Sequence, residues 1–174
     1  MTDRRVTGDR GATLVEFAFV FPILAMLLFG VISAGIAWNQ NLSLAQASRI
    51  GGRYAATLPT WNYTSMDDYL DAVASRVVDA SESSLDSSIS GRVVCVAYVY
   101  PAGSATLDQT RMRNETTSGV TRSNGTCFSD GQTSSERRVQ VMVERSATFE
   151  TGLWSRTITI HQQVVYRYEV TSGL

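Results

Sequence analysis

Apolar residues are concentrated in one uninterrupted run near the start of the chain. No charged residue occurs from Phe17 to Trp38. A helix of about 20 apolar residues is long enough to cross the hydrocarbon core of a bilayer, which is about 30 Å thick. The run therefore predicts a transmembrane helix over residues 12–38. The milder pattern of residues 39–65 predicts that the helix continues as a stalk and ends in a linker, although Gly51-Gly52 lowers the helix propensity there.

A second, amphipathic helix is predicted over residues 66–86. Ser65, followed three residues later by Asp68, is similar to a capping box, in which a hydroxyl and a carboxylate satisfy the free N–H groups of a helix start. Beyond this start, large apolar residues recur at helical spacing and form one buried face. They are Leu70, Val73, Val77 and Leu85.

The rest of the chain predicts strands. Residues 92–100 are apolar on both faces, which is typical of a central strand. Residues 137–150 and 156–170 predict two more strands, with a hairpin turn between them, and the clear alternation in 156–170 indicates one face toward a core and one toward water. Residues 101–135 are rich in Ser, Thr, Gly and Asn, so we expect a long surface excursion.

These elements define an α+β fold class: a long transmembrane and stalk helix, a second helix and a small antiparallel sheet. The segments expected are a leader at 1–11, the transmembrane helix at 12–38, the stalk and linker at 39–65, and an extracytoplasmic domain at 66–174. The chain has two cysteines, Cys95 and Cys127. An even number in an exported domain favours a disulfide, worth about 3–4 kcal/mol on the chain-entropy model. Two separate thiols are the alternative.

Composition argues against several functions. The net charge of −1 provides no basic field for nucleic acid. The sequence contains no catalytic or phosphate-binding motif, and two Cys with one His fall short of a zinc site. His161 lies on the water-facing side of its strand, and Asp67, Asp68 and Asp71 fit helix capping better than acid–base chemistry. We therefore expect no enzymatic activity, no metal and no cofactor.

A carboxylate at the start of the apolar run requires an explanation. Glu16 lies five residues after Gly11 and directly before Phe17. An acidic group costs about 2.5–3.5 kcal/mol near the middle of a membrane helix and less at its end, so an interfacial residue on an ordinary anchor is one interpretation. The other is that cleavage after Gly11 makes Ala12 a free ammonium terminus, with which Glu16 pairs in the same or a neighbouring subunit.

A basic leader, a glycine, four residues, Glu-Phe and a long apolar helix together resemble a prepilin leader and its cleavage site. The segment from Arg10 to Pro22, followed by the Ala- and Arg-containing residues 45–56, resembles the TadE family of pseudopilins of the Tad/Flp tight-adherence pilus system. The resemblance covers roughly the first third of the chain. It implies cleavage at Gly11–Ala12, subunit pairing through Glu16 and Phe17, and a role in pilus assembly.

The resemblance also implies partners and a location. The partners would be a prepilin peptidase, other Tad pilins and pseudopilins, inner-membrane pilus assembly proteins and the lipid bilayer. We expect a single-pass protein of the cytoplasmic membrane, with its N-terminus cytoplasmic and its C-terminal domain outside. Three alternatives stay open: an uncleaved anchor that displays an extracytoplasmic binding domain, an anchored enzyme, and an ordinary secretory signal, for which the apolar run is long.

Overall fold

The structure is a computed structural model that describes residues 9–100, 110–132, 136–150 and 154–169. Helix α1, Asp9–Thr57, is one continuous helix of 49 residues, about 70 Å long. It passes through Pro22 without a break and continues through the predicted stalk. A short 3₁₀-helix, η1, Thr60–Asn62, lies in the predicted linker.

Helix α2, Met66–Ala80, begins as the sequence predicts. The Ser65 hydroxyl accepts a hydrogen bond from the Asp68 amide at 3.2 Å and donates one to the Asp68 carboxylate at 2.9 Å. The helix is shorter than predicted, because Ser81 caps it and the next two residues, Glu82 and Ser83, have positive φ angles of 47° and 73°. The predicted apolar residues Leu70, Val73, Val77 and Leu85 are all buried, Leu85 from the turn that follows the helix.

Five antiparallel strands form one sheet in the order β3-β2-β1-β4-β5. Their bounds are β1 Val93–Val99, β2 Arg111–Thr116, β3 Gly119–Ser123, β4 Arg138–Glu150 and β5 Ser155–Arg167. The prediction of a central strand is confirmed, since β1 pairs with β2 on one side and with β4 on the other. The alternation predicted for β5 is also confirmed in its second half, where Ile160 and Tyr168 are buried and His161 and Arg167 are exposed.

The prediction of a surface excursion over 101–135 is wrong for its central part. Residues 111–123 form the hairpin β2–β3, which extends the sheet by two strands. Its loop, Thr117 and Ser118, leads into Gly119, whose φ of +128° favours a residue without a side chain. Residues 101–109 and 133–135 lie outside the described residues, as do residues 151–153 of the predicted hairpin turn between β4 and β5.

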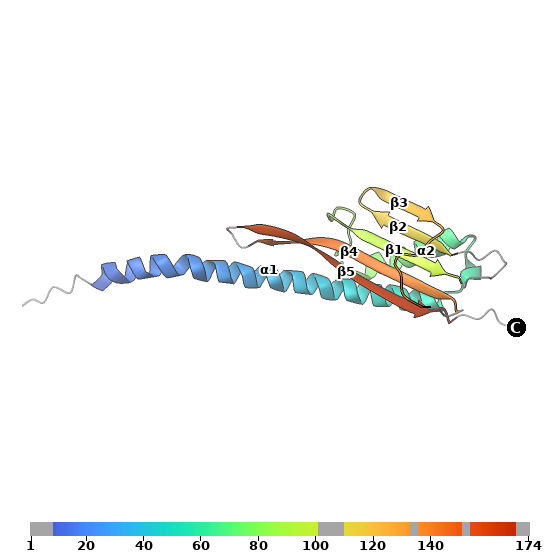
Figure 1. The fold of residues 1–174 in the computed structure, drawn as a ribbon, viewed down its shortest axis with the longest axis horizontal. Coiled ribbons are helices and arrows are strands. Elements are labelled where there is room, and N and C mark those ends of the chain that lie inside the picture. The colour runs from blue at the N-terminus through green and yellow to red at the C-terminus, as the bar shows by residue number, and fades with distance from the viewer. Residues whose placement is uncertain (1–8, 101–109, 133–135, 151–153, 170–174) are drawn as a thin grey trace, which may run out of the picture.

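Both helices pack against the same sheet to form the core (Figure 1). The C-terminal half of α1 contributes Leu44, Ala47 and Ala55, which are fully buried. Gly51 and Gly52 permit this close approach, since a Cβ on Gly51 would overlap Val77 of α2 and one on Gly52 would lie 2.5 Å from the Tyr166 ring of β5. The N-terminal half of α1 extends beyond the sheet, and the β4–β5 ribbon runs along part of it (Figure 1).

Candidate membrane and assembly segment

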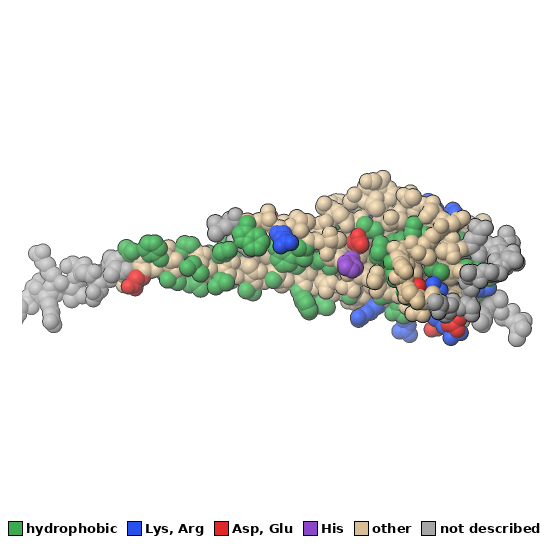
Figure 2. Space-filling model, in the orientation of Figure 1, with side chains coloured by type: hydrophobic (Ala, Val, Ile, Leu, Met, Phe, Trp, Pro, Cys, Tyr) green, Lys and Arg blue, Asp and Glu red, His purple; other side chains and the backbone are tan. Residues whose placement is uncertain are grey.

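The N-terminal half of α1 is almost entirely exposed in the isolated chain. Hydrophobic side chains cover this half of the helix (Figure 2). Among the described residues, α1 is the one helix long and apolar enough to cross a membrane. Its exposed large apolar residues before the stalk are Leu14, Val15, Phe17, Phe19, Val20, Phe21, Ile23, Leu24, Leu27, Leu28, Phe29, Val31, Ile32, Ile36 and Trp38. Such a surface is costly in water, and a lipid or protein environment would cover it.

The predicted cleavage and pairing residues all lie on this helix. Gly11 and Ala12 belong to the first turns of α1, so the helix begins before the predicted end of the leader. Glu16 and Phe17 are exposed, and the Phe17 ring lies 5.5 Å from the ring of Phe21, one turn further on. The Glu16 side chain is therefore accessible to a neighbouring subunit.

Small residues follow in the outer part of the apolar run. Gly30 and Gly35 have nothing within 4 Å of the position that a Cβ would occupy. The Ser33 hydroxyl donates a hydrogen bond to the carbonyl of Glu150, at the end of β4, over 2.8 Å. Thus the small-residue segment is open on part of its circumference and touches the ribbon on another part.

The predicted disulfide is confirmed. Cys95 of β1 is bonded to Cys127, which lies between β3 and β4. Gln140 of β4 holds the same segment: its side-chain oxygen accepts from the Cys127 amide at 3.1 Å, and its side-chain nitrogen donates to Asp130 at 2.8 Å. Arg138 also binds Asp130, and these hydrogen bonds lower the pKa of that carboxyl to about 2.

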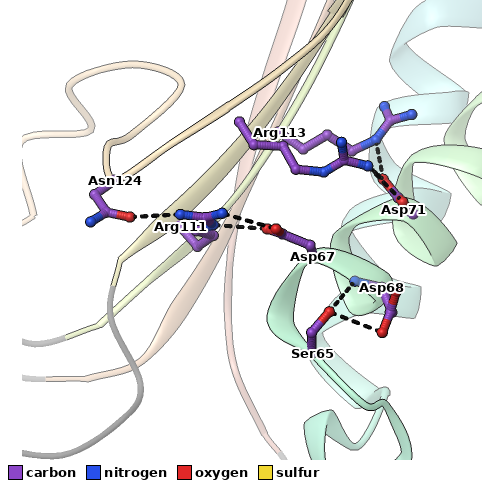
Figure 3. Close-up of polar contacts among 8 residues, drawn as sticks. Ser65, Asp67, Asp68, Asp71, Arg111, Arg113 and Asn124 are labelled. Atoms are coloured by element: carbon purple, nitrogen blue, oxygen red, sulfur yellow. Dashed lines mark hydrogen bonds and ion pairs between the residues drawn. The ribbon is translucent and has the colours of Figure 1, made fainter.

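Two of the acidic residues that we assigned to helix capping have another role. Asp67 accepts two hydrogen bonds from Arg111 of β2, at 2.8 and 2.9 Å (Figure 3). Hydrogen bonding to Arg111 is the main cause of the lowered pKa of Asp67. One turn further on, Asp71 binds both Arg113 and Arg122, which lie opposite each other on β2 and β3. Of the three, Asp68 alone takes part in the cap, through its hydrogen bonds with the Ser65 side chain. The sequence signal was the matching spacing, Asp67/Asp71 on a helix and Arg111/Arg113 on a strand.

A third acidic residue, Glu115, extends these ion pairs into an ionic layer between α2 and the β2–β3 hairpin. Glu115 lies 2.7 Å from Arg92 and 2.7 Å from Arg113. Burial acts to raise the pKa of Glu115, but the hydrogen bonds from the two arginines outweigh it, and the pKa is lowered. The layer attaches the β2–β3 hairpin to α2 and contributes to the fold. Every carboxylate in the layer pairs with at least one arginine, which is an arrangement for structural attachment rather than for acid–base chemistry.

Within the residues that the structure describes, no group of three or more His, Cys, Asp or Glu side chains could hold a metal ion. His161 is exposed and lines an open cavity between α1 and β5.

Comparison with protein families supports the resemblance noted in the sequence. Residues 11–53 match the model of the family described as TadE-like protein. The match begins at the predicted cleavage site, contains the whole exposed apolar segment and ends four residues before the last residue of α1. Searches among curated proteins and among solved structures find no significant match.

Proposed function

We propose that this chain is a minor pilin, or pseudopilin, of a Tad/Flp-type pilus, because residues 11–53 match the model of the TadE-like protein family. In this proposal a prepilin peptidase cuts after Gly11, and the apolar part of α1 anchors the mature chain in the cytoplasmic membrane. The sheet domain then lies outside, where it takes part in pilus assembly with other Tad pilins and inner-membrane assembly proteins.

One observation carries the proposal. The family match coincides with a helix whose first half buries almost nothing within its own chain and whose second half is fixed in the domain core. A subunit that packs its helix among other helices requires this division. A domain that is merely secreted has no use for an exposed apolar segment of this length.

The disulfide supports the proposed orientation. Disulfides form and persist outside the reducing cytoplasm. Cys95 and Cys127 are bonded in the domain that follows the membrane helix. This favours a C-terminal domain on the outer side and an N-terminus in the cytoplasm, where the leader would meet the peptidase.

The pairing role proposed for Glu16 follows from its position. Ala12 and Glu16 are four residues apart in one helix, so a free amine at Ala12 would lie on the same face as the carboxylate. Near lipid both charges are poorly solvated when they are alone. Pairing between the two, within one chain or between neighbours, neutralises both and fixes the register of the packed helices.

The test is the first residue of the mature protein, read from material purified from membranes. We expect Ala12 in cells with an active prepilin peptidase and Met1 in cells without one. Gly11→Leu should block the cut, because its side chain obstructs an extended backbone in the protease cleft. Gly8→Leu, at a leader glycine three residues earlier, is the matched control and should be cut normally.

A second arm tests assembly separately from cleavage. Glu16→Ala should leave the N-terminus at Ala12 and reduce pilus formation strongly, whereas Glu16→Asp, which keeps the charge, should retain more. Normal piliation of Glu16→Ala would refute the pairing role. A native N-terminus at Met1, with the peptidase active, would refute the pilin proposal and leave an uncleaved anchor that displays an external domain.

A further inference from the structure

The end of the β4–β5 ribbon lies beside Ser33 of α1. Strand β1 pairs with β4 only as far as Glu144, so the following residues of β4 have β5 as their strand partner. This two-stranded ribbon continues along α1 toward its N-terminus (Figure 1). It is attached near its end by the hydrogen bond from Ser33 to the carbonyl of Glu150.

The level of Ser33 lies near the outer end of the proposed membrane span, five residues before Trp38. The 21 residues from Thr13 to Ser33 extend about 30 Å along the helix, which is the thickness of a bilayer's hydrocarbon core. If α1 crosses the membrane with Glu16 near the inner surface, Ser33 lies near the outer surface. The end of the ribbon must then lie there too.

The backbone of the ribbon prevents it from entering the hydrocarbon. A two-stranded ribbon has open edges with unpaired N–H and C=O groups, and such groups cost several kcal/mol each in lipid. The headgroup region, which is wet and polar, tolerates them. The ribbon therefore sets a limit to how far α1 can sink toward the inner side.

The side chains near the end of the ribbon are those that suit a membrane interface. Trp154 is 54% exposed, Arg156 is exposed, and Phe149 is half-buried. On α1, Trp38 is 66% exposed about one turn above Ser33. Tryptophan is enriched at headgroup level, and arginine is attracted by lipid phosphates. Figure 2 shows a basic side chain beside hydrophobic ones in this part of the molecule.

An open cavity joins these two surfaces. It has a volume of about 480 Å³ between α1 and β5. Its apolar wall includes Ala34, Ala37 and Ile158, and its polar side includes Asn41 and His161. The apolar surface of the helix thus continues onto the ribbon at the level where the bilayer would end.

We propose that the end of the β4–β5 ribbon, Phe149, Glu150 and Trp154 to Arg156, rests on the outer headgroup layer of the bilayer that α1 crosses. This contact is a second attachment to the membrane and fixes the depth of α1. The proposal rests on the membrane anchor of the proposed function. A second copy of the chain is a less favoured occupant, because the level of the ribbon end follows from the helix alone.

The three tryptophans of the chain provide the test. The full-length protein is reconstituted in vesicles of phosphatidylethanolamine and phosphatidylglycerol that carry a nitroxide quencher either at the headgroup or deep in the acyl chain. Three variants each keep one tryptophan and replace the other two by Phe. All three side chains are more than half exposed, so Phe should be tolerated.

We expect the headgroup quencher to quench Trp154 several-fold more than the deep quencher does, and Trp38 should behave similarly. Trp61 is the matched control, with a similar exposure of 57%, and lies beyond the far end of α1. Neither the headgroup quencher nor the deep quencher should quench the fluorescence of Trp61. The single variant Trp154→Phe, compared with the unsubstituted protein, gives the same difference without the double replacements.

The two proposals fail in different ways. Quenching of Trp38 without quenching of Trp154 would overturn the ribbon contact and leave the anchor intact. Shielding of Trp154 from acrylamide without lipid quenching would also overturn it, in favour of a contact between copies. Strong quenching of Trp154 by the deep label would refute the headgroup level. Absence of quenching at both positions would overturn the membrane anchor itself.

Discussion

Asp130 shows how single residues in this domain depend on their partners. Its side chain is 6% exposed and binds both Arg138 and Gln140, and so connects the segment after Cys127 with β4. The arginine holds the pKa of the carboxyl at about 2, below the value of about 4 for an unfolded aspartate. The ionised form is thus preferred in the folded state.

The lowered pKa predicts a pH dependence of stability. The contribution of Asp130 is fully present above about pH 4 and is lost as the pH falls toward 2, because the unfolded state takes up the proton first. In Asp130→Asn this contribution is absent at every pH. The difference in free energy of unfolding between the two proteins should therefore shrink between about pH 5 and pH 2, as urea titrations would show.

Ser129→Ala is the control for this experiment, since Ser129 is exposed and adjacent. Ser129→Ala should change the free energy of unfolding little at any pH in this range. Parallel curves for Asp130→Asn and the unsubstituted protein across the acidic range would contradict the assigned pairing.

At the scale of elements, the packing of α1 on α2 depends on a glycine, Gly51. A Cβ on Gly51 would overlap the stiff, branched side chain of Val77, whereas one on Gly35 in the same helix would meet nothing within 4 Å. Alanine has the higher helix propensity by about 0.5–1 kcal/mol. Helix propensity therefore favours alanine at both positions, but only Gly35 has room for its side chain.

We predict opposite effects of the same substitution at these positions. Gly51→Ala should lower the free energy of unfolding by about 1–3 kcal/mol, because overpacking outweighs the gain in propensity. Gly35→Ala should leave it unchanged or raise it slightly. Chemical unfolding of the full-length protein in detergent measures both, and equal stability of the two variants would show that the helices do not approach as closely as described.

The elements that could be predicted from the sequence are those with an apolar surface. The uncharged run, the apolar face of α2 and the alternation in β5 are each produced by transfer of apolar groups from water, so the pattern is visible in the residues themselves. Strands β2 and β3 were missed because their attachment is ionic. The inward side of β2 carries Arg113, which is 9% exposed and faces Asp71.

The roles of Gly11, Ala12, Glu16 and Phe17 stay predictions. They were made from the order of these residues along the chain, because a cleavage site and an apolar run are local features. The contact between Ser33 and Glu150 joins residues 117 positions apart. No local pattern indicates such a contact, which depends on the length and direction of the β4–β5 ribbon.

At the scale of the whole molecule, α1 is shared between two environments. Its second half completes the domain core: Leu44 and Ala55 are fully buried, and the Ala55 carbonyl accepts a hydrogen bond from the Tyr69 hydroxyl at 2.7 Å. The Glu169 amide donates to the Ala56 carbonyl at 3.0 Å, which joins the end of β5 to the end of α1.

Because the second half of α1 belongs to the domain core, a fragment of the chain should fold only if it contains that half. A fragment of residues 39–174, exported to an oxidising compartment, should fold as a soluble domain with its disulfide formed. A fragment of residues 58–174 should not fold, since it lacks the α1 part of the core. Circular dichroism and amide exchange would show the difference, and cooperative unfolding of the shorter fragment would contradict it.

A pair of leucines in the longer fragment gives a finer control. Leu44 is fully buried and Leu42 is 51% exposed. Leu44→Ala should cost about 2–5 kcal/mol, and Leu42→Ala much less.

Two widely separated hydrogen bonds join α1 to the sheet: Ser33 binds Glu150 at the end of β4, and Ala56 binds Glu169, two residues after β5. Because these two contacts are far apart along α1, the helix cannot tilt relative to the sheet. Transmembrane helices lean by about 20° from the bilayer normal on average, by an amount that depends on their neighbours. If α1 spans a membrane as proposed, any change in its tilt when subunits join or leave would rotate the sheet through the same angle, and the parts of the sheet farthest from the membrane would move the most.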